Sequence, residues 1–342
     1  MRLTLPPRGR RAQRTLAVSA APALVLGLAL TAPAHSATAS PAPTPSASPD
    51  HDRPVYLSHP LDNRASARTT TGTYWTPERM AHAVPADRLT RDAITHASPG
   101  DRMPATTAAR PAAPAPAGGA AKTHKSQTIG KVFFTTEGGV DMVCSGSAVN
   151  SKAKNMVMTA GHCVNGGKGK SWYHRWIFVP GYGPGNRTPN GLYRAKRLIS
   201  LAGWVKHSNL NDDVGIALVK PVRGTKKKLV KNVGGYGVQF GRSGHRKLAA
   251  IGYSQVNYKG DKQKNCRKWT HRRKHDKFQL VMRCHVLTGG ASGGPWVKGK
   301  AIKGQGLVNG VNSTNNDLHH PTKIRTPYFG RDVFRMYNAF RK

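Results

Sequence analysis

The sequence has 342 residues, with 54 Lys and Arg, 15 Asp and Glu, 4 Cys and a formal net charge of +39. This length suffices for one large domain or two small ones. No apolar run beyond residue 39 reaches the ~20 residues that a membrane-spanning helix needs, so we expect no membrane span in the mature chain. The charge predicts attraction to polyanions and carries no information about catalysis.

Residues 1–39 predict a secretory signal peptide. Arginines between Arg2 and Arg14 form a positive stretch, and the apolar run Leu16–Leu30 follows it. Small residues come next, which places a cleavage site after Ser36 or Ala39. The apolar run is shorter than a membrane span, so we expect a soluble protein that is secreted to the extracellular side.

Residues 40–121 form a second region, whose two ends are rich in Pro and Ala. Such composition is typical of linkers with little packed structure. Between them, the stretch YWTPERMAHAVPADRL (74–89) suits one or two short helices. We interpret the region as a poorly ordered propeptide and linker; a disordered spacer is the alternative.

Residues 122–342 predict an all-β domain. Turn-forming Gly, Asn and Pro clusters separate short β-rich runs, which is typical of a barrel or a sandwich. Only the tail GRDVFRMYNAF (330–340) has helical spacing. The β-rich runs are KVFFTT, GSAVN, NMVMTA, RWIFVP, VGIALVK, KLAAIGYSQV, FQLVMRC, GPWVKG and GQGLVNGV.

All four cysteines lie in this third region, and export favours disulfides. Three pairings are open. Pairing sequence neighbours gives Cys144–Cys163 and Cys266–Cys284, each closing a short loop worth about 3 kcal/mol in the chain-entropy model. No CxxC spacing supports the rival zinc site, so we expect no metal.

The third region is strongly basic, with 41 Lys and Arg against 8 Asp and Glu. The stretch 259–283 is the densest part. This charge suits electrostatic association with anionic cell-wall polymers; a solvated basic face is the alternative. There is no recognised nucleic-acid-binding motif, and export argues against a dedicated nucleic-acid partner.

Three segments carry residues of the kind that nucleophilic catalysis needs. TAGHC (159–163) places His162 where an apolar run meets a turn. NLNDDVGIALVK (209–220) places Asp212 and Asp213 before an apolar run that predicts a buried strand. LTGGASGGPWV (287–297) surrounds Ser292 with glycines, whose bare N–H groups suit an oxyanion hole. Each segment alone also has a structural interpretation: a hydrogen-bonded histidine, a turn acid or a Gly-rich turn.

Together, these segments resemble the chymotrypsin-like serine endopeptidases, particularly the secreted bacterial branch that includes the glutamyl endopeptidases. The motifs C-x-G-x-x-V (144–149), TAGHC, D-x-G-I-A-L (213–218) and G-x-S-G-G-P (290–295) occur in the family's order. The resemblance covers most of 130–315. It implies two antiparallel six-stranded β-barrels, with the site in the cleft between them.

The resemblance also assigns roles. It implies His162 as the base, Asp213 as its orienting acid and Ser292 as the nucleophile, with the N–H groups of Gly290 and Ser292 holding the oxyanion. It implies the disulfide Cys144–Cys163. Asp213 is preferred to Asp212 because it stands next to the buried strand; we expect Asp212 to cap a turn or face solvent.

The chain departs from the family at three places. Ala291 replaces the aspartate that pairs with the new terminal amine in animal members, so a zymogen would need another restraint, such as a propeptide over the cleft. The base of the specificity pocket falls on Val286 or Leu287, without the acid that a Lys or Arg preference requires. Glutamyl endopeptidases carry a histidine in the strand after the serine, but this chain has Val308 or Asn309 at that place, which argues against a strong Glu preference. Thr288 completes the expected pocket and, with the positive charge, leaves acceptance of Glu open.

We therefore predict a secreted serine endopeptidase that acts on proteins or peptides without a cofactor. The alternative is a non-catalytic, strongly basic protein on the same fold that binds cell wall or polyanions. GASGG also matches the G-x-S-x-G elbow of α/β-hydrolases, but the helices of that fold are missing from the pattern, and its histidine comes last in the chain.

Overall fold

The computed structural model describes residues 54–61, 71–88, 106–109 and 125–342. The predicted signal peptide lies outside these residues. Within the described part of the chain, no helix is both long and apolar enough to cross a bilayer.

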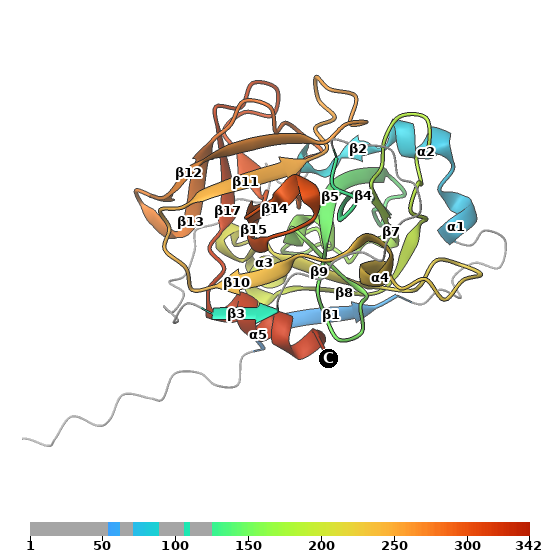
Figure 1. The fold of residues 1–342 in the computed structure, drawn as a ribbon, viewed down its shortest axis with the longest axis horizontal. Helices are drawn as coiled ribbons and strands as arrows, with labels where there is room; N and C mark the ends of the chain where they lie inside the picture. The colour runs from blue at the N-terminus through green and yellow to red at the C-terminus, as the bar shows by residue number, and fades with distance from the viewer. Residues whose placement is uncertain (1–53, 62–70, 89–105, 110–124) are drawn as a thin grey trace, which may run out of the picture. The chain divides into compact units, whose positions relative to one another are not determined.

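Six antiparallel strands form a closed first barrel (Figure 1). Their order is β8–β7–β4–β5–β6–β9, and β9 pairs back onto β8. All seven residues of β4 are buried because it lies between β5 and β7, with no solvent-facing side. The expected first barrel is thus confirmed. Its strands are β4 (Ile129–Thr135), β5 (Asp141–Val149), β6 (Met156–Thr159), β7 (His174–Pro180), β8 (Tyr193–Leu201) and β9 (Gly215–Val219).

The second half forms another antiparallel ring, in the order β11–β12–β13–β17–β16 and then β15–β14–β11. Here β15 and β16 act as one strand that is interrupted at Asn312 and Ser313. Beside this ring, β10 pairs in parallel with β15, and β3 pairs with β10. These strands are β3 (Thr106–Ala109), β10 (Gly237–Phe240), β11 (Lys247–Gly252), β12 (Lys264–Arg273), β13 (Asp276–Arg283), β14 (Pro295–Lys298), β15 (Leu307–Val311), β16 (Thr314–Asn315) and β17 (Lys323–Pro327).

Few helices accompany the strands. The expected C-terminal helix is confirmed as α5 (Arg331–Phe340), and its buried side chains are Val333, Met336 and Tyr337. The other helices of the described residues are short: α1 (Thr71–Tyr74), α2 (Pro77–His82), α3 (Ala202–His207) and α4 (Leu229–Val233), with several single 3-10 turns.

The N-terminal segment, which we define as residues 54–61 and 71–88, packs on the first barrel. Strand β1 (Tyr56–Pro60) pairs antiparallel with β8. Trp75 is buried, donates a 2.7 Å hydrogen bond from Nε1 to the Arg175 carbonyl, and contacts the Phe133 ring. The short helix expected after Trp75 is confirmed as α2. The expectation of a poorly ordered propeptide is wrong for these residues, because Trp75, Met80, Ala83 and Ala86 are buried in the core cluster of the first barrel.

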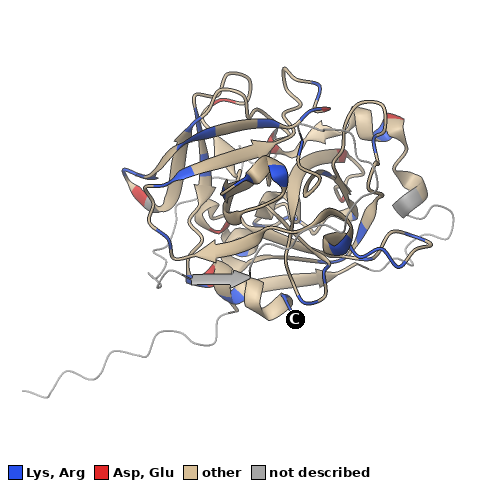
Figure 2. Cartoon of the chain, in the orientation of Figure 1, with Lys and Arg blue, Asp and Glu red and all other residues tan. Residues whose placement is uncertain are grey.

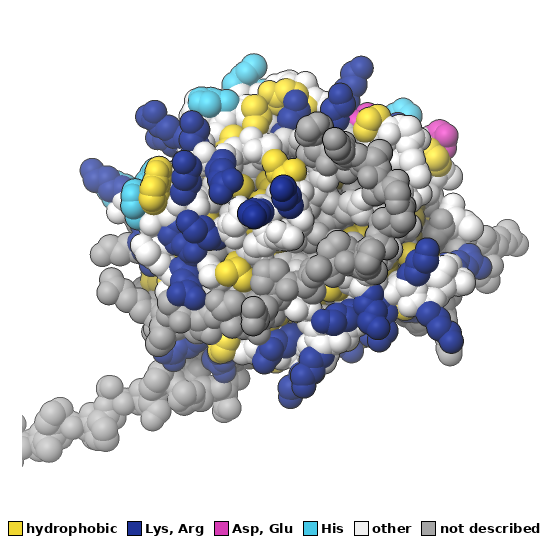
Figure 3. Space-filling model, viewed as in Figure 1, with side chains coloured by type: hydrophobic (Ala, Val, Ile, Leu, Met, Phe, Trp, Pro, Cys, Tyr) yellow, Lys and Arg dark blue, Asp and Glu magenta, His cyan; other side chains and the backbone are white. Residues whose placement is uncertain are grey.

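The basic residues lie mainly on the surface. Figure 2 shows Lys and Arg on both sheets and few acids, and in Figure 3 they stand out across the visible face. Within the basic stretch 259–283, strand β12 exposes most of its side chains, including Trp269, which is 57% exposed and stacks on His245. Most of this strand is solvated, although Thr270 is buried and Cys266 packs against the core.

Candidate active site

His162 lies in a 3-10 turn, Gly161–Cys163, directly after the buried strand β6. The turn is packed closely: a Cβ on Gly161 would come within 2.8 Å of the Trp204 ring. The His162 ring itself lies edge-on to Trp204, with ring centroids 6.1 Å apart. Small residues precede His162 because a bulkier side chain would displace this packing.

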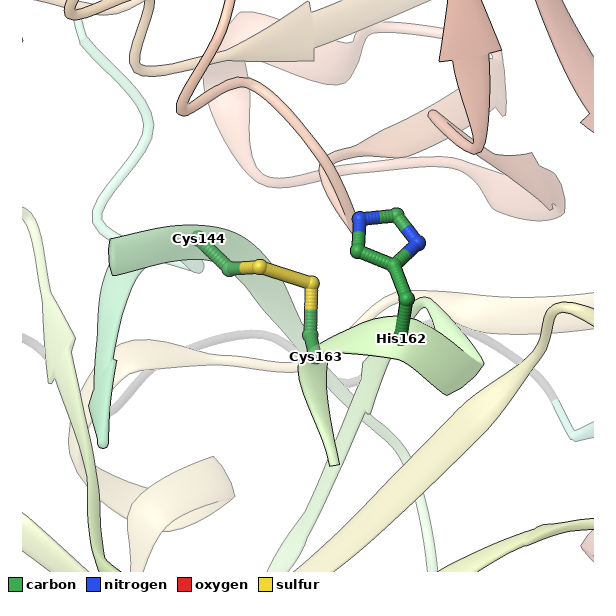
Figure 4. Close-up of side chains that lie close together, drawn as sticks. All are labelled: Cys144, His162 and Cys163. Atoms are coloured by element: carbon green, nitrogen blue, oxygen red, sulfur yellow. A yellow bond between two sulfur atoms is a disulfide. The ribbon is translucent and has the colours of Figure 1, made fainter. Parts of the chain in front are cut away.

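A disulfide joins Cys163, the last residue of that turn, to Cys144 of β5. Figure 4 shows the His162 ring rising from the same turn beside it. Both sulfurs lie near the imidazole, but they are bonded to each other and offer no thiolate to a metal. The disulfide therefore fixes the turn that presents His162. The second expected disulfide, Cys266–Cys284, is also present.

Asp213 is completely buried and faces His162. Its Oδ2 lies 2.8 Å from His162 Nδ1, and its Oδ1 accepts a 2.8 Å hydrogen bond from the His162 backbone N–H. The Ser313 hydroxyl donates to Oδ2 at 2.6 Å. Three donors thus hold the carboxylate, which offsets the cost of burying a charge.

The surroundings set opposite pKa directions for the pair. Burial opposes a charged imidazole, but the charge and hydrogen bond of Asp213, with the charge of Asp87, hold the pKa of His162 above its usual value. Burial likewise opposes the Asp213 carboxylate, yet His162 and the other donors keep its pKa below the usual range. Asp213 is therefore ionised where it contacts the imidazole.

Asp212 has a different environment. Its Oδ2 accepts a 2.7 Å hydrogen bond from Asn209 Nδ2 at the turn before β9. Burial, followed by the charge of Asp332, raises the pKa of Asp212 to about 7. The Asp212 side chain is partly buried and does not face solvent. It packs against Gly203, where a Cβ would lie 2.0 Å from Asp212 Oδ2.

The loop Gly289–Gly294 carries Ser292, which is 2% exposed. Gly290 has φ +94° and Gly293 φ +79°, conformations that L side chains rarely adopt. A Cβ on Gly293 would stand 2.0 Å from Thr159 Oγ1 and 2.4 Å from the Ser145 carbonyl oxygen. Glycine is required here because the serine loop lies directly on the first barrel, close to the strand that leads to His162.

Two polar side chains fix this loop, and sequence reasoning missed both. The Ser145 hydroxyl donates to the Gly290 carbonyl and accepts from the Tyr253 N–H, each at 2.9 Å. Asn312 Nδ2 donates to the Ala291 carbonyl at 2.8 Å. Ser145 stands in the C-x-G-x-x-V motif, but nothing in that motif indicates a contact 145 residues away.

Asp87 of the N-terminal segment is hydrogen-bonded to the loop that carries Ser292. It lies in the 3-10 turn Ala86–Arg88 and is 7% exposed. Its Oδ1 accepts a 2.5 Å hydrogen bond from the Ser292 hydroxyl, and its Oδ2 accepts a 2.7 Å bond from the Gly290 N–H. His162 Nε2 is buried and has no hydrogen-bond partner among the described residues. No sequence motif pointed to Asp87.

A small pocket opens beside Ser292. Of the expected pocket residues, Leu287 and Thr288 line it, whereas Val286, Val308 and Asn309 do not. Val308 is fully buried in the core, and Asn309 bonds to Arg246 and Gln239. The opposite wall instead begins at the interruption between β15 and β16. The lining residues are Asp87, Leu287, Thr288, Ala291, Ser292, Asn312, Ser313, Thr314, Asn315 and Ile324.

Comparisons of the sequence with family models and with curated proteins found no match. Solved structures do match. A thermostable serine protease, AL20, from an extremophilic microorganism is 29% identical, with a TM-score of 0.58 over 64% of this chain and 99% of that one. The protease Anisep from Arthrobacter nicotinovorans is 33% identical, with a TM-score of 0.58 over 64% of this chain and 96% of that one.

Both proteins match this chain over nearly their whole length. The chain therefore belongs to the bacterial serine proteases of the chymotrypsin-like fold.

Proposed function

We propose that the protein is a secreted serine endopeptidase in which Ser292 is the nucleophile, His162 the general base and Asp213 the acid that orients the base. The observation that carries this is the buried pair His162–Asp213, with two hydrogen bonds of 2.8 Å, placed beside a serine loop of the G-x-S-G-G-P type. The role of this pair is to hold the imidazole with Nε2 directed away from Asp213.

The reaction proceeds through an acyl-enzyme. His162 Nε2 accepts the Ser292 proton as Oγ attacks the scissile carbonyl, and the imidazolium then protonates the leaving amine. The N–H groups of Gly290 and Ser292 stabilise the oxyanion. Water, activated by the same imidazole, hydrolyses the acyl-enzyme and regenerates the serine.

The pocket supports a preference for uncharged side chains. Its lining carries hydroxyl and amide groups from Thr288, Thr314 and Asn315 beside apolar Leu287 and Ile324. Apart from Asp87, which belongs to the N-terminal segment, no charged residue appears in this lining. A trypsin-like preference for Lys or Arg is therefore not expected.

The proposal includes the chain's organisation. Residues 1–39 serve as a signal peptide, residues 40–121 as a propeptide with its linker, and residues 122–342 as the protease domain. The solvated β12 and its neighbours also suit electrostatic association with anionic cell-wall polymers, since they combine exposed Lys and Arg with the stacked pair Trp269 and His245.

The test of the catalytic roles is labelling with a fluorophosphonate, which reacts only with an activated serine. We expect a single adduct on Ser292 in the processed protein, and none in Ser292→Ala. Peptidase activity of that variant should fall by a factor on the order of 10⁶. The matched control is Ser147→Ala, which alters a buried serine of β5 whose hydroxyl has no partner among the described residues. Labelling elsewhere, or activity of Ser292→Ala within tenfold of wild type, would refute the assignment.

A further inference from the structure

The carboxylate of Asp87 contacts two groups of the proposed catalytic machinery at once. It accepts from the Ser292 hydroxyl and from the Gly290 N–H, although Asp87 precedes these residues by more than 200 positions. In an enzyme of this kind, the hydroxyl serves as nucleophile. The N–H donates a hydrogen bond to the substrate oxygen on which negative charge develops. A carboxylate already carries negative charge, so it fits a site built for an oxyanion.

The backbone around Asp87 is docked independently of that carboxylate. Strand β2 (Val84–Pro85) pairs with Met142 and Val143 of β5, and Gln255 Nε2 donates a 2.6 Å hydrogen bond to the Ala83 carbonyl. Further upstream, Trp75 is buried against the first barrel. These contacts direct the chain into the site and hold Asp87 there.

The acid–base pair and the loop backbone are already in place around Asp87. The Gly290 N–H is directed at the carboxylate, and the His162–Asp213 bonds are formed. Ala291 has no carboxylate, so the loop does not depend on pairing with a new terminal amine to reach this shape. Asp87 therefore leaves the His162–Asp213 pair and the loop backbone in place, but it binds the Ser292 hydroxyl and leaves His162 Nε2 without a partner among the described residues.

We propose that Asp87 is an autoinhibitory residue whose carboxylate binds the Gly290 N–H of the oxyanion hole and the Ser292 hydroxyl, keeping the unprocessed protease inactive. This inference rests on the catalytic roles proposed above for Ser292 and Gly290. A side-chain carboxylate is a durable occupant, because it presents no scissile carbonyl to the serine. Only removal or displacement of the N-terminal segment frees the site.

The experiment compares variants of the full chain before processing. Asp87→Ala removes the carboxylate, and Asp87→Asn keeps its size without its charge. Glu78→Gln is the matched control, since Glu78 is an exposed acid of the same segment on α2. The measurement is the rate of fluorophosphonate labelling of the species with unprocessed mass, with secreted yield and both disulfides as the check on folding.

We expect Asp87→Ala to label at least tenfold faster than wild type, because the variant loses both charged hydrogen bonds, to the Ser292 hydroxyl and to the Gly290 N–H. Asp87→Asn should fall between the two, and Glu78→Gln should match wild type. Equal labelling of Asp87→Ala and Glu78→Gln would overturn the proposal while leaving Ser292 as the nucleophile. If even the processed wild-type protein fails to label, the proposed function falls, and the autoinhibitory role falls with it.

A second measurement separates a charged occupant from mere bulk. The charge of Asp87 contributes to the raised pKa of His162, so Asp87→Ala and Asp87→Asn should both lower that pKa, as followed by the NMR titration of the His162 ring in the unprocessed chain. Glu78→Gln should leave it unchanged. An unchanged His162 titration in both Asp87 variants would show that the carboxylate does not reside in the site, and would overturn the proposal.

Discussion

Ser313 and His162 bind the same oxygen of Asp213: the Ser313 hydroxyl donates to Oδ2 at 2.6 Å, and His162 Nδ1 lies 2.8 Å from it. Ser313 stands at the interruption between β15 and β16, where the strand no longer pairs regularly and the side chain turns inward. The second barrel thus reaches across to fix the acid of the first.

Ser313→Ala should lower kcat of the processed enzyme by about tenfold. A hydrogen bond to a charged group contributes about 1.5–3 kcal/mol, and Asp213 keeps its two bonds to His162. The kinetics of peptide hydrolysis, with kcat and KM separated, give the measurement. A change confined to KM would mean that Ser313 acts only as part of the pocket wall. Ser147→Ala again provides the control.

Asp213→Asn should lower kcat by roughly 10⁴, because an amide no longer holds the imidazole in the required tautomer. Asp212→Asn should have far less effect, since Asp212 bonds to Asn209 and not to His162. Both variants remove one acid from the same turn, so they control for each other. If Asp212→Asn proved the more damaging, the orienting acid would be misassigned.

The buried Lys131 should make the free energy of unfolding depend on pH. It lies in β4, is 2% exposed, and has its pKa lowered to about 8, chiefly by burial. Because the unfolded chain binds the proton more tightly, the free energy of unfolding should rise between pH 8 and about 10.5, by about 3 kcal/mol from this residue. Lys131→Met should lose that rise when urea unfolding is compared at pH 7.5 and 9.5. An equal pH dependence in both proteins would contradict the cause given.

The activity of the mature enzyme should not depend on which of several neighbouring residues forms its N-terminus. Ala291 lacks the carboxylate that would pair with a terminal amine, and its side chain packs instead in the second barrel's core. Mature forms that begin at neighbouring residues between 105 and 130 should therefore show the same kcat/KM. N-terminal sequencing of the secreted protein, with assays of forms one or two residues longer or shorter, provides the check. Activity confined to one start residue would refute this prediction.

Periodicity and local motifs predicted five of the six strands of the first barrel because strands such as β4, β6 and β9 are short, apolar and bounded by turns. They missed β8, whose apolar residues are interrupted by three charged ones. They failed for β12, whose charged side chains are exposed although its backbone pairs on both sides. The position of the pocket wall was also missed. The break in β15 depends on tertiary hydrogen bonds of Asn312, which no local pattern shows.

Asp87 illustrates the same limit more strongly. The stretch VPADR has an ordinary turn composition, and its acid gains meaning only from docking against the distant residues Gly290 and Ser292. The burial of Trp75 was equally hard to predict, because the aromatic pair Tyr74 and Trp75 is followed by polar residues and shows no periodicity.

Strand β1 has a consequence for the enzyme once the N-terminal segment has left. It pairs with β8 from Arg197 to Leu201, and the Leu61 N–H adds a 3.0 Å bond to the Lys196 carbonyl. Its departure opens a row of unsatisfied backbone groups, a template on which another chain can add a strand. The charges of Lys196 and Arg197 at this edge repel a second copy, so the mature enzyme should remain monodisperse in dilute buffer and self-associate as salt screens them.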